Sequence, residues 1–328
     1  MIAKQHDMTF ILFHLKTPSI KTALQILLLL SGCIFQSAFA RQSNVDFSDL
    51  KKFAEFAAAS YQPPAEIAIL CKQKGFTLDQ YNSIADIKIS YFLATDRLNK
   101  TQIISVRGTS NIENALVDIA LKLVLDKHTG IQLHHGFSVA AEAIYAEIQP
   151  KLKADYTIST TGHSLGGAVA LILAMHLDID QFKTGQIVTF GQPKVTSIAG
   201  VNKFQHLKIN RVVTPEDLVP LVPPLDPVDL NNIGIYWHAG REIILLDGNH
   251  YALLQGINSM LRATRFTQQA LSEKNLHDHK MSLYIKLLNK KIPTAKQVPY
   301  KNSFNLFNLF GENFRQAHPA IFSAVYLH

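Results

Sequence analysis

The sequence predicts an α/β fold in which buried parallel strands are followed by helices. Residues 101–106 and 185–190 are short apolar runs closely followed by glycine, as buried parallel strands are. Residues 155–161 are rich in β-branched side chains, and an apolar, helix-forming run follows at 168–175. The chain has 328 residues, 47% hydrophobic and 17% charged, which is enough to bury an extensive core as one unit.

Other elements follow from the same kind of pattern. Residues 50–61 are predicted to form an opening helix that ends before two consecutive prolines. Residues 207–214 are a predicted strand, and residues 281–288 a predicted helix near the end of the domain.

A serine between glycines lies where the strand at 155–161 gives way to its helix. Residues 162–167 read Gly-His-Ser-Leu-Gly-Gly. In a strand–turn–helix of this kind the serine occupies a strained turn, and glycine at 162 and 166 lets strand and helix approach closely. The helix start also supplies N–H donors and a positive dipole end beside the reacting oxygen. The context predicts Ser164 as a nucleophile; the alternative is a glycine-rich turn without chemistry.

A nucleophilic serine needs a base and a carboxylate that orients the base, in the chain order Ser, Asp, His. Asp217 lies in a proline-bounded loop just after the predicted strand 207–214, where the orienting carboxylate belongs. Asp226 and Asp229 are the alternatives, and an aspartate in such a loop is also an ordinary turn residue.

Spacing does not choose the base, because the chain has 14 histidines. Those that follow Asp217 are His238, His250, His277, His279, His318 and His328. His277 and His279 open the predicted helix at 281–288, from which an imidazole could reach over the strand ends.

Several segments together resemble the fungal-type (class 3) lipases of the α/β-hydrolase superfamily. The matching segments, in the order of that family, are residues 106–110, 134–137 (His-His-Gly-Phe), 161–168, 189–195, 211–220, 236–240 and 278–284. They cover about residues 45–290. The resemblance implies an α/β-hydrolase fold, with a mostly parallel central sheet and helices on both faces.

The resemblance also implies roles for individual residues. Ser164 is the implied nucleophile, Asp217 the orienting acid and His279 the base, with His277 left as the competitor. The backbone N–H groups of Thr109 and Leu165 match the positions that form the oxyanion hole, whereas His238 falls on a structural position of the family. The implied activity is hydrolysis of carboxylic esters of lipids, acylglycerols or phospholipids, through an acyl-enzyme. The alternative is a catalytically silent relative that binds lipid or a protein partner.

The segment after Thr109 bears on the substrate. Residues 112–125 have the pattern of an apolar helix with a narrow polar stripe. In the family this region includes a lid, and the alternative prediction is a buried core helix or strand. Ala115 stands where the family commonly has tryptophan, which predicts weaker interfacial anchoring. Lys194 and Thr196 replace the usual arginine and glycine of the family.

Both ends of the chain lie outside this domain. Residues 1–40 have the basic start, apolar run and Ala-x-Ala end of an export signal, which predicts secretion. Residues 30–33 also match a bacterial lipobox, in which case residues 1–32 are removed and Cys33 anchors a surface lipoprotein. Residues 291–328 are a basic and aromatic extension, predicted to form a packed C-terminal helix or a membrane-docking element.

The remaining features exclude several classes of function. Only two cysteines are present, and we expect no disulfide, since Cys33 would be removed or lipidated and Cys71 left alone. No zinc-type spacing or phosphate-binding loop occurs, so we expect no metal and no cofactor. The formal charge of the chain is +7, and residues 1–40 contribute +2 of it, so the chain from Arg41 onward carries +5. This positive charge favours contact with anionic lipid surfaces. We expect a monomer with a lipid or other ester substrate and no nucleic acid partner.

Overall fold

The computed structural model describes residues 45–85, 88–109, 122–223, 236–263 and 273–300. The chain divides into two units, residues 1–45 and 46–328, and the following concerns the second. The predicted export signal and lipobox, Asp226, Asp229, His318 and His328 lie outside the described residues.

The main sheet is mostly parallel. Within the described ranges its strand order is β1-β2-β3-β6-β7-β9-β11-β12-β13, and the five central strands from β3 to β11 run parallel. The strands are β1 (Thr77–Ile84), β2 (Ile89–Asp96), β3 (Thr101–Val106), β6 (Thr157–His163), β7 (Thr184–Phe190), β9 (Lys208–Val213), β11 (Arg241–Leu245), β12 (His250–Leu254) and β13 (Lys296–Gln297). A smaller antiparallel sheet has the order β10-β8-β5-β4, with strands β10 (Tyr236–Trp237), β8 (Thr196–Ser197), β5 (Gln132–His134) and β4 (Leu123–Leu125).

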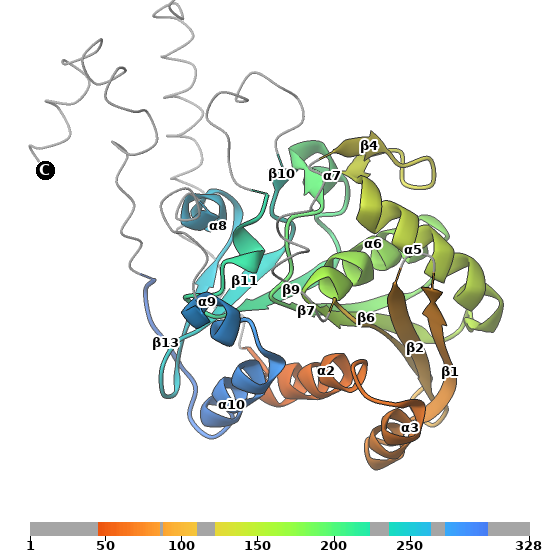
Figure 1. Ribbon diagram of the computed structural model, residues 1–328, viewed down its shortest axis with the longest axis horizontal. Helices are drawn as coiled ribbons and strands as arrows, with labels where there is room; N and C mark the ends of the chain where they lie inside the picture. Colours follow the sequence, from red (N-terminus) through yellow and green to blue (C-terminus); the bar gives the residue numbers. More distant parts are fainter. Residues whose placement is uncertain (1–44, 86–87, 110–121, 224–235, 264–272, 301–328) are drawn as a thin grey trace, which may run out of the picture. The chain divides into compact units, whose positions relative to one another are not determined.

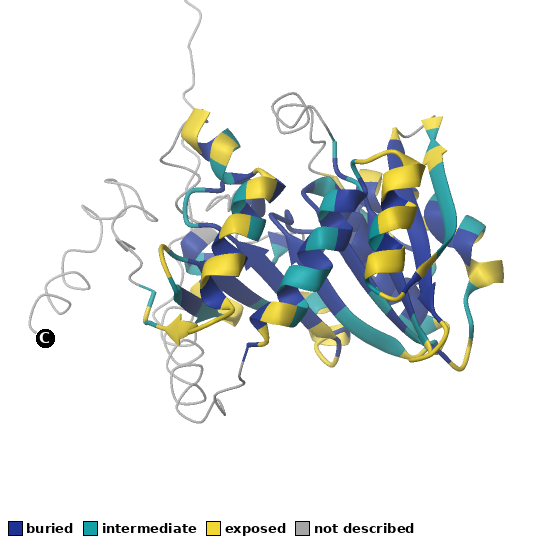
Figure 2. Ribbon diagram, turned by 90° about the horizontal axis from the view of Figure 1, so that it is seen from below, coloured by how far each residue is buried: buried dark blue, intermediate teal, exposed yellow. Residues whose placement is uncertain are grey.

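Helices cover both faces of the main sheet, so its strands are buried on two sides (Figure 1). The helices are α2 (Phe47–Ala59), α3 (Pro64–Gln73), α5 (His135–Ile148), α6 (Leu165–Ile179), α7 (Ile198–Lys203), α8 (Gly256–Ala263), α9 (Glu273–Asp278) and α10 (Met281–Lys291). Helices α5 and α6 lie on one face, and α2 and α10 lie on the other. Figure 2 shows the inner faces of these helices buried and their outer faces exposed.

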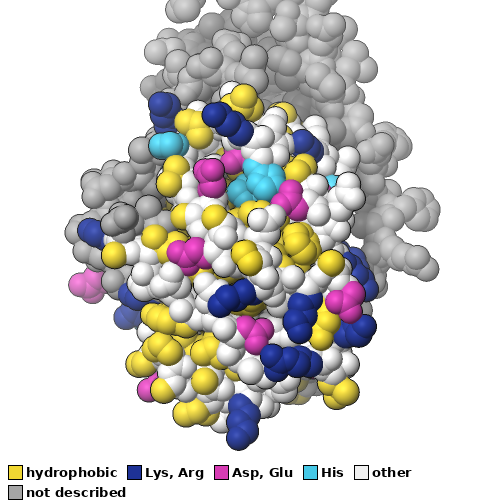
Figure 3. Space-filling view, turned by 90° about the vertical axis from the view of Figure 1, so that its right-hand side faces the viewer, with side chains coloured by type: hydrophobic (Ala, Val, Ile, Leu, Met, Phe, Trp, Pro, Cys, Tyr) yellow, Lys and Arg dark blue, Asp and Glu magenta, His cyan; other side chains and the backbone are white. Residues whose placement is uncertain are grey.

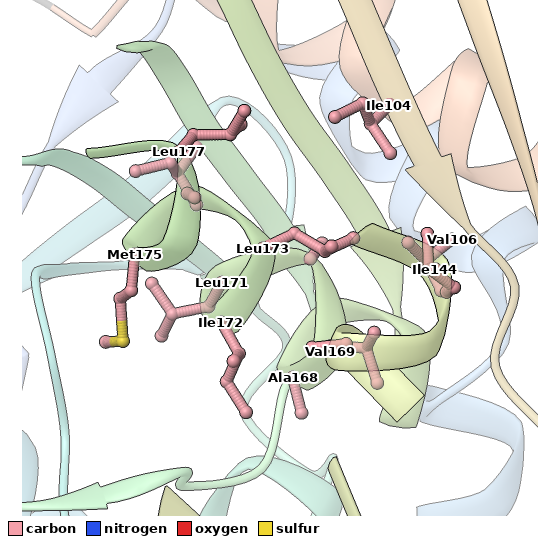
Figure 4. Packing of buried hydrophobic residues seen from close by; sticks show 14 of the residues in the cluster. Ile104, Val106, Ile144, Ala168, Val169, Leu171, Ile172, Leu173, Met175 and Leu177 are labelled. Carbon is pink, nitrogen blue, oxygen red and sulfur yellow. The ribbon is translucent and has the colours of Figure 1, made fainter. Parts of the chain in front are cut away.

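Helix α6 is the centre of a large hydrophobic cluster in the described part of the chain. Every residue of α6 from Gly166 to Leu177 is buried, because the sheet covers one side of the helix and α5 packs on another. In Figure 4, Leu173 of α6 points toward Val106 of β3 and Ile144 of α5. A helix that is apolar around most of its circumference is stable only in such a central position.

The fold predicted from the sequence is confirmed. The strand predicted at 101–106 has those bounds, and the helix predicted at 50–61 is α2, which begins and ends slightly earlier. Residues 112–125 are described only from residue 122 onward, and Leu123–Leu125 form strand β4 rather than a helix. Residues 296–297 pair with β12, so the sheet continues past residue 290, where the sequence prediction ends the domain.

Two features of the second unit concern its surroundings. None of the described helices combines the length and the hydropathy needed to cross a membrane. On the face seen from the right of Figure 1, basic and acidic side chains are interspersed, so the net positive charge of the sequence does not gather there in one patch (Figure 3).

Candidate active site

Ser164 lies at the turn between β6 and α6, in a backbone conformation that few non-glycine residues adopt. Its φ is +58° and its ψ is −133°. A Cβ on Gly162 would lie 2.4 Å from the carbonyl oxygen of Gly166, and a Cβ on Gly166 would lie 2.3 Å from that of Val106. Only glycine fits at these two positions, so close packing of strand and helix imposes the strained turn at Ser164.

Asp217 follows β9 and is fully buried. His279 Nδ1 donates to its Oδ2 across 2.8 Å, the Tyr284 hydroxyl donates to the same oxygen across 2.5 Å, and the Val219 N–H donates to Oδ1 across 2.9 Å. Burial raises the pKa of Asp217, but the charge of His279 and these hydrogen bonds together bring the pKa below its ordinary value. The carboxylate is therefore held ionised against the imidazole.

The two competing histidines of the sequence have different environments. His279 is 4% exposed, contacts Asp217 through Nδ1 and leaves its buried Nε2 without a hydrogen bond. The side chain of His277 is 65% exposed and pairs with Asp278 across 3.0 Å. The structure thus brings His279, and not His277, to Asp217.

His238 is also buried, but its surroundings differ from those of His279. Burial first, and then the charges of Arg211, Lys194 and Arg262, lower the pKa of His238 well below its ordinary value. His238 therefore remains neutral among cations, in keeping with the structural position that the resemblance implies.

The backbone at the end of β7 connects the Ser164 turn to the Asp217–His279 pair. The Ser164 N–H donates to the Phe190 carbonyl across 2.8 Å. The next residue, Gly191, has φ +59°, and a Cβ there would lie 2.8 Å from both Asp217 Oδ2 and His279 Cε1. Gly191 therefore leaves space for the acid–base pair directly beside the backbone partner of Ser164.

Ser164 is 1% exposed, and within the described residues neither its hydroxyl nor His279 Nε2 has a hydrogen-bond partner. These are the two atoms that proton transfer from serine to base would join. Hydrogen bonds of this kind are often long in enzymes without substrate and tighten when substrate binds.

The segment before Thr109 packs against the serine turn. A Cβ on Gly108 would lie 2.6 Å from the His163 carbonyl oxygen and 3.0 Å from Ser164 Cβ. Leu165 is the first residue of α6, where backbone N–H groups have no partner inside the helix. The two segments predicted to supply the oxyanion hole therefore flank Ser164.

Sequence reasoning missed the side chains that hold the Asp217 loop. Arg262 Nη2 donates to the Thr214 carbonyl across 2.9 Å at the start of the loop, and Lys194 Nζ donates to the Leu221 and Pro223 carbonyls at its end. Arg262 also forms a fully buried ion pair with Glu242 across 2.8 Å. The sequence marks Lys194 only as a replacement of the family's arginine and does not mark Arg262, because each acts on a segment far from it along the chain.

A cavity of about 460 Å³ lies beside the segments that carry Asp217 and His279. Its lining includes Pro215, Glu216, Asp278 and Leu287, but not Ser164. This cavity is therefore not where a substrate would meet the serine. Across the described parts of the chain, no three His, Cys, Asp or Glu side chains are arranged to hold a metal ion.

The fold and the chain order of these groups define the general class. A mostly parallel sheet, a serine at a strained strand-to-helix turn, an aspartate after a later strand and a histidine beyond it are the arrangement of the α/β-hydrolases. Lipase II from Rhizopus niveus has the same fold, with a TM-score of 0.54 and 25% identity over 62% of this chain and 81% of that chain.

Residues 103–226 match the family described as Lipase (class 3). It is 34% identical over 146 residues to the secreted mono- and diacylglycerol lipase 1 of Fusarium solani, covering 42% of this chain and 44% of that protein. It is 33% identical over 169 residues to a lipase of Rhizomucor miehei, covering 46% of this chain and 43% of that protein. The chain thus spans less than half the length of the curated relatives it matches.

Proposed function

We propose that this protein is a serine hydrolase that cleaves carboxylic ester bonds of lipids, with Ser164 as nucleophile, Asp217 as orienting acid and His279 as base. The observation that carries the proposal is the buried His279–Asp217 hydrogen bond, which leaves His279 Nε2 unpaired beside the strained turn of Ser164. The class 3 lipase family and the named lipase relatives support the same activity.

The chemistry follows from these groups. Asp217 accepts from Nδ1 of His279 and so fixes the tautomer in which Nε2 is the free base. His279 Nε2 takes the Ser164 proton as the alkoxide attacks the ester carbonyl. The Thr109 and Leu165 N–H groups would bind the developing oxyanion, which is usually the largest single catalytic contribution. His279 then protonates the leaving alcohol, and water releases the acyl group with His279 again as base.

The substrate class is the finer part of the proposal. The Fusarium solani relative is named a mono- and diacylglycerol lipase, and another relative from Arabidopsis thaliana is named a phospholipase A1. We propose acylglycerols as the substrate of this protein.

The location of the protein follows the same relatives. The Fusarium solani protein is named as secreted, and residues 1–40 carry the predicted export signal. We propose an exported, extracellular enzyme; anchoring through Cys33 is the alternative outcome. The intact mass of the mature protein separates a start at Arg41 from a diacylated Cys33.

Replacing the nucleophile tests the activity directly. We expect Ser164→Ala to lower kcat by on the order of 10⁶ on dissolved short-chain esters and on emulsified acylglycerols, as in other Ser-His-Asp systems. Circular dichroism of both proteins controls for folding. Near-normal hydrolysis by a folded Ser164→Ala variant contradicts the proposal, and a preference for phosphatidylcholine over acylglycerols corrects its substrate class.

A further inference from the structure

His163, the residue before Ser164, connects two parts of the site through its side chain. His163 is 7% exposed, its Nε2 lies 2.7 Å from the backbone carbonyl oxygen of His279, and its Nδ1 lies 2.8 Å from the hydroxyl of Tyr61. The mechanism above uses neither the imidazole of His163 nor the phenol of Tyr61.

The partners of His163 define its tautomer. A carbonyl oxygen only accepts hydrogen bonds, so Nε2 of His163 carries the proton and donates to His279. Nδ1 is then the acceptor, and the Tyr61 hydroxyl donates to it. Burial first, and then the charge of His279, lower the pKa of His163 to about 3, so the imidazole stays neutral near neutral pH.

Tyr61 extends the connection to the segment before Thr109. Burial raises the pKa of Tyr61 to about 12, so the phenol keeps the proton that it donates, while its oxygen accepts a hydrogen bond from the Gly108 backbone. A single path of hydrogen bonds thus runs from Gly108 through Tyr61 and His163 to the carbonyl of His279. It joins four segments that are far apart in the sequence.

The path bears on the position of the proposed base. His163 and Ser164 are consecutive, so a bond from the His163 ring to the His279 carbonyl ties the backbone of the base to the backbone of the nucleophile. Asp217 fixes the His279 ring, and Thr214 Oγ1 fixes the neighbouring carbonyl of Asp278 across 2.9 Å. Of these three hydrogen bonds, only the one from His163 links the backbone of His279 directly to the turn that carries Ser164.

We propose that His163, oriented by Tyr61, is a positioning residue that holds the His279 backbone so that Nε2 of the base faces the Ser164 hydroxyl. This inference rests on the proposed function. It assigns the histidine of the Gly-His-Ser-Leu-Gly-Gly segment a role in catalysis that does not involve contact with substrate.

Two isosteric replacements separate the two hydrogen bonds of His163. His163→Gln places an amide nitrogen near the former Nε2, so it keeps a donor to His279 and loses the acceptor for Tyr61. His163→Asn places an amide oxygen near the former Nδ1, so it keeps the bond to Tyr61 and does not reach His279. We expect His163→Asn to lower kcat by about 10²-fold with KM within about twofold, the usual result of misplacing a catalytic group.

His163→Gln and Tyr61→Phe should be milder. We expect each to lower kcat by about tenfold or less, the value of a single neutral hydrogen bond. In the double variant of His163→Gln and Tyr61→Phe, the second substitution should lower kcat less than it does alone. The amide introduced by His163→Gln no longer depends on Tyr61. The exposed His277→Gln is the matched control, and we expect its kcat to equal that of the parent protein.

All variants are compared with Ser164→Ala on one dissolved ester. Equal kcat values for His163→Asn and His163→Gln, with hydrolysis still lost in Ser164→Ala, overturn the positioning role and leave the proposed function intact. Hydrolysis that survives Ser164→Ala overturns the proposed function itself. If the His163 variants do not fold, Tyr61→Phe decides: a kcat equal to that of the parent overturns the inference.

Discussion

The serine turn and the Asp217–His279 pair are built by different physical means. The turn is local: glycines at 162 and 166 let β6, α6 and β3 meet at distances that no Cβ tolerates, and Ser164 is forced to φ +58°. The acid–base pair joins residues 62 positions apart through one hydrogen bond between buried side chains. Steric packing therefore fixes the proposed nucleophile, whereas hydrogen bonds and charges fix the proposed base.

This difference predicts where substitutions act. Changes at the glycines should impair folding before chemistry, because they push backbone segments apart. Changes around Asp217 should impair chemistry in a folded protein, because they alter the tautomer or position of His279.

Among the groups that hold His279, the largest effect in a folded protein is expected at the carboxylate. Asp217→Asn should lower kcat by about 10⁴, since an amide stabilises the wrong tautomer of the base. The control is Asp278→Asn, whose carboxylate pairs with the exposed His277. Steady-state kinetics measure kcat of both variants, and their thermal unfolding midpoints control for folding. An Asp217→Asn enzyme as active as the Asp278→Asn control would remove Asp217 from the site.

Substitution of a glycine at the serine turn should lower the stability of the protein. Gly166→Ala puts a Cβ 2.3 Å from the Val106 carbonyl oxygen, and we expect it to lower the free energy of unfolding by about 3 kcal/mol or more. Gly136→Ala is the control, because a Cβ there would be 3.6 Å from the nearest atom, in the side chain of His134. Urea unfolding measures both. Equal stabilities would mean that close packing does not impose the turn.

The smallest effect concerns Lys194, which holds the end of the Asp217 loop. Burial first, and then the Arg211 charge, lower the pKa of Lys194 from 10.5 to about 7. Between these values the unfolded chain binds a proton that the folded chain does not, so stability should rise with pH, by up to about 1.4 kcal/mol per pH unit.

Lys194→Met should lack this contribution. The measurement is the free energy of unfolding of the parent and of Lys194→Met between pH 7 and pH 9, and the difference between the two isolates Lys194 from other groups that titrate there. Parallel pH dependences in the two proteins would show that the folded protein keeps Lys194 charged.

The same comparison explains how much the sequence could predict. The strand at 101–106 and the serine turn were predictable because their signals, an apolar run and spaced glycines, lie within a few residues of each other. Asp217 was placed by its position after a predicted strand. The choice of His279 over His277 came only from family resemblance, since spacing along the chain does not tell which imidazole reaches a buried carboxylate.

The roles of other residues in the site did not follow from the sequence. Tyr284 ends the matching segment 278–284, but the resemblance gave it no role, whereas in the fold its hydroxyl donates to Asp217 from within α10. Lys194 was noted only as a departure from the family pattern, whereas in the fold it is fully buried and bonded to loop carbonyls. The predicted lid, apart from residues 122–125, and the predicted C-terminal helix lie outside the described residues and stay predictions.

The most direct test of the central claim is covalent labelling by a fluorophosphonate, followed by peptide mass analysis. We expect one adduct, on Ser164, that forms at a much lower rate in His279→Ala and at the parental rate in His277→Ala. An adduct on another residue would contradict Ser164 as the nucleophile, and labelling of Ser164 that is as fast without the His279 imidazole as with it would contradict His279 as the base.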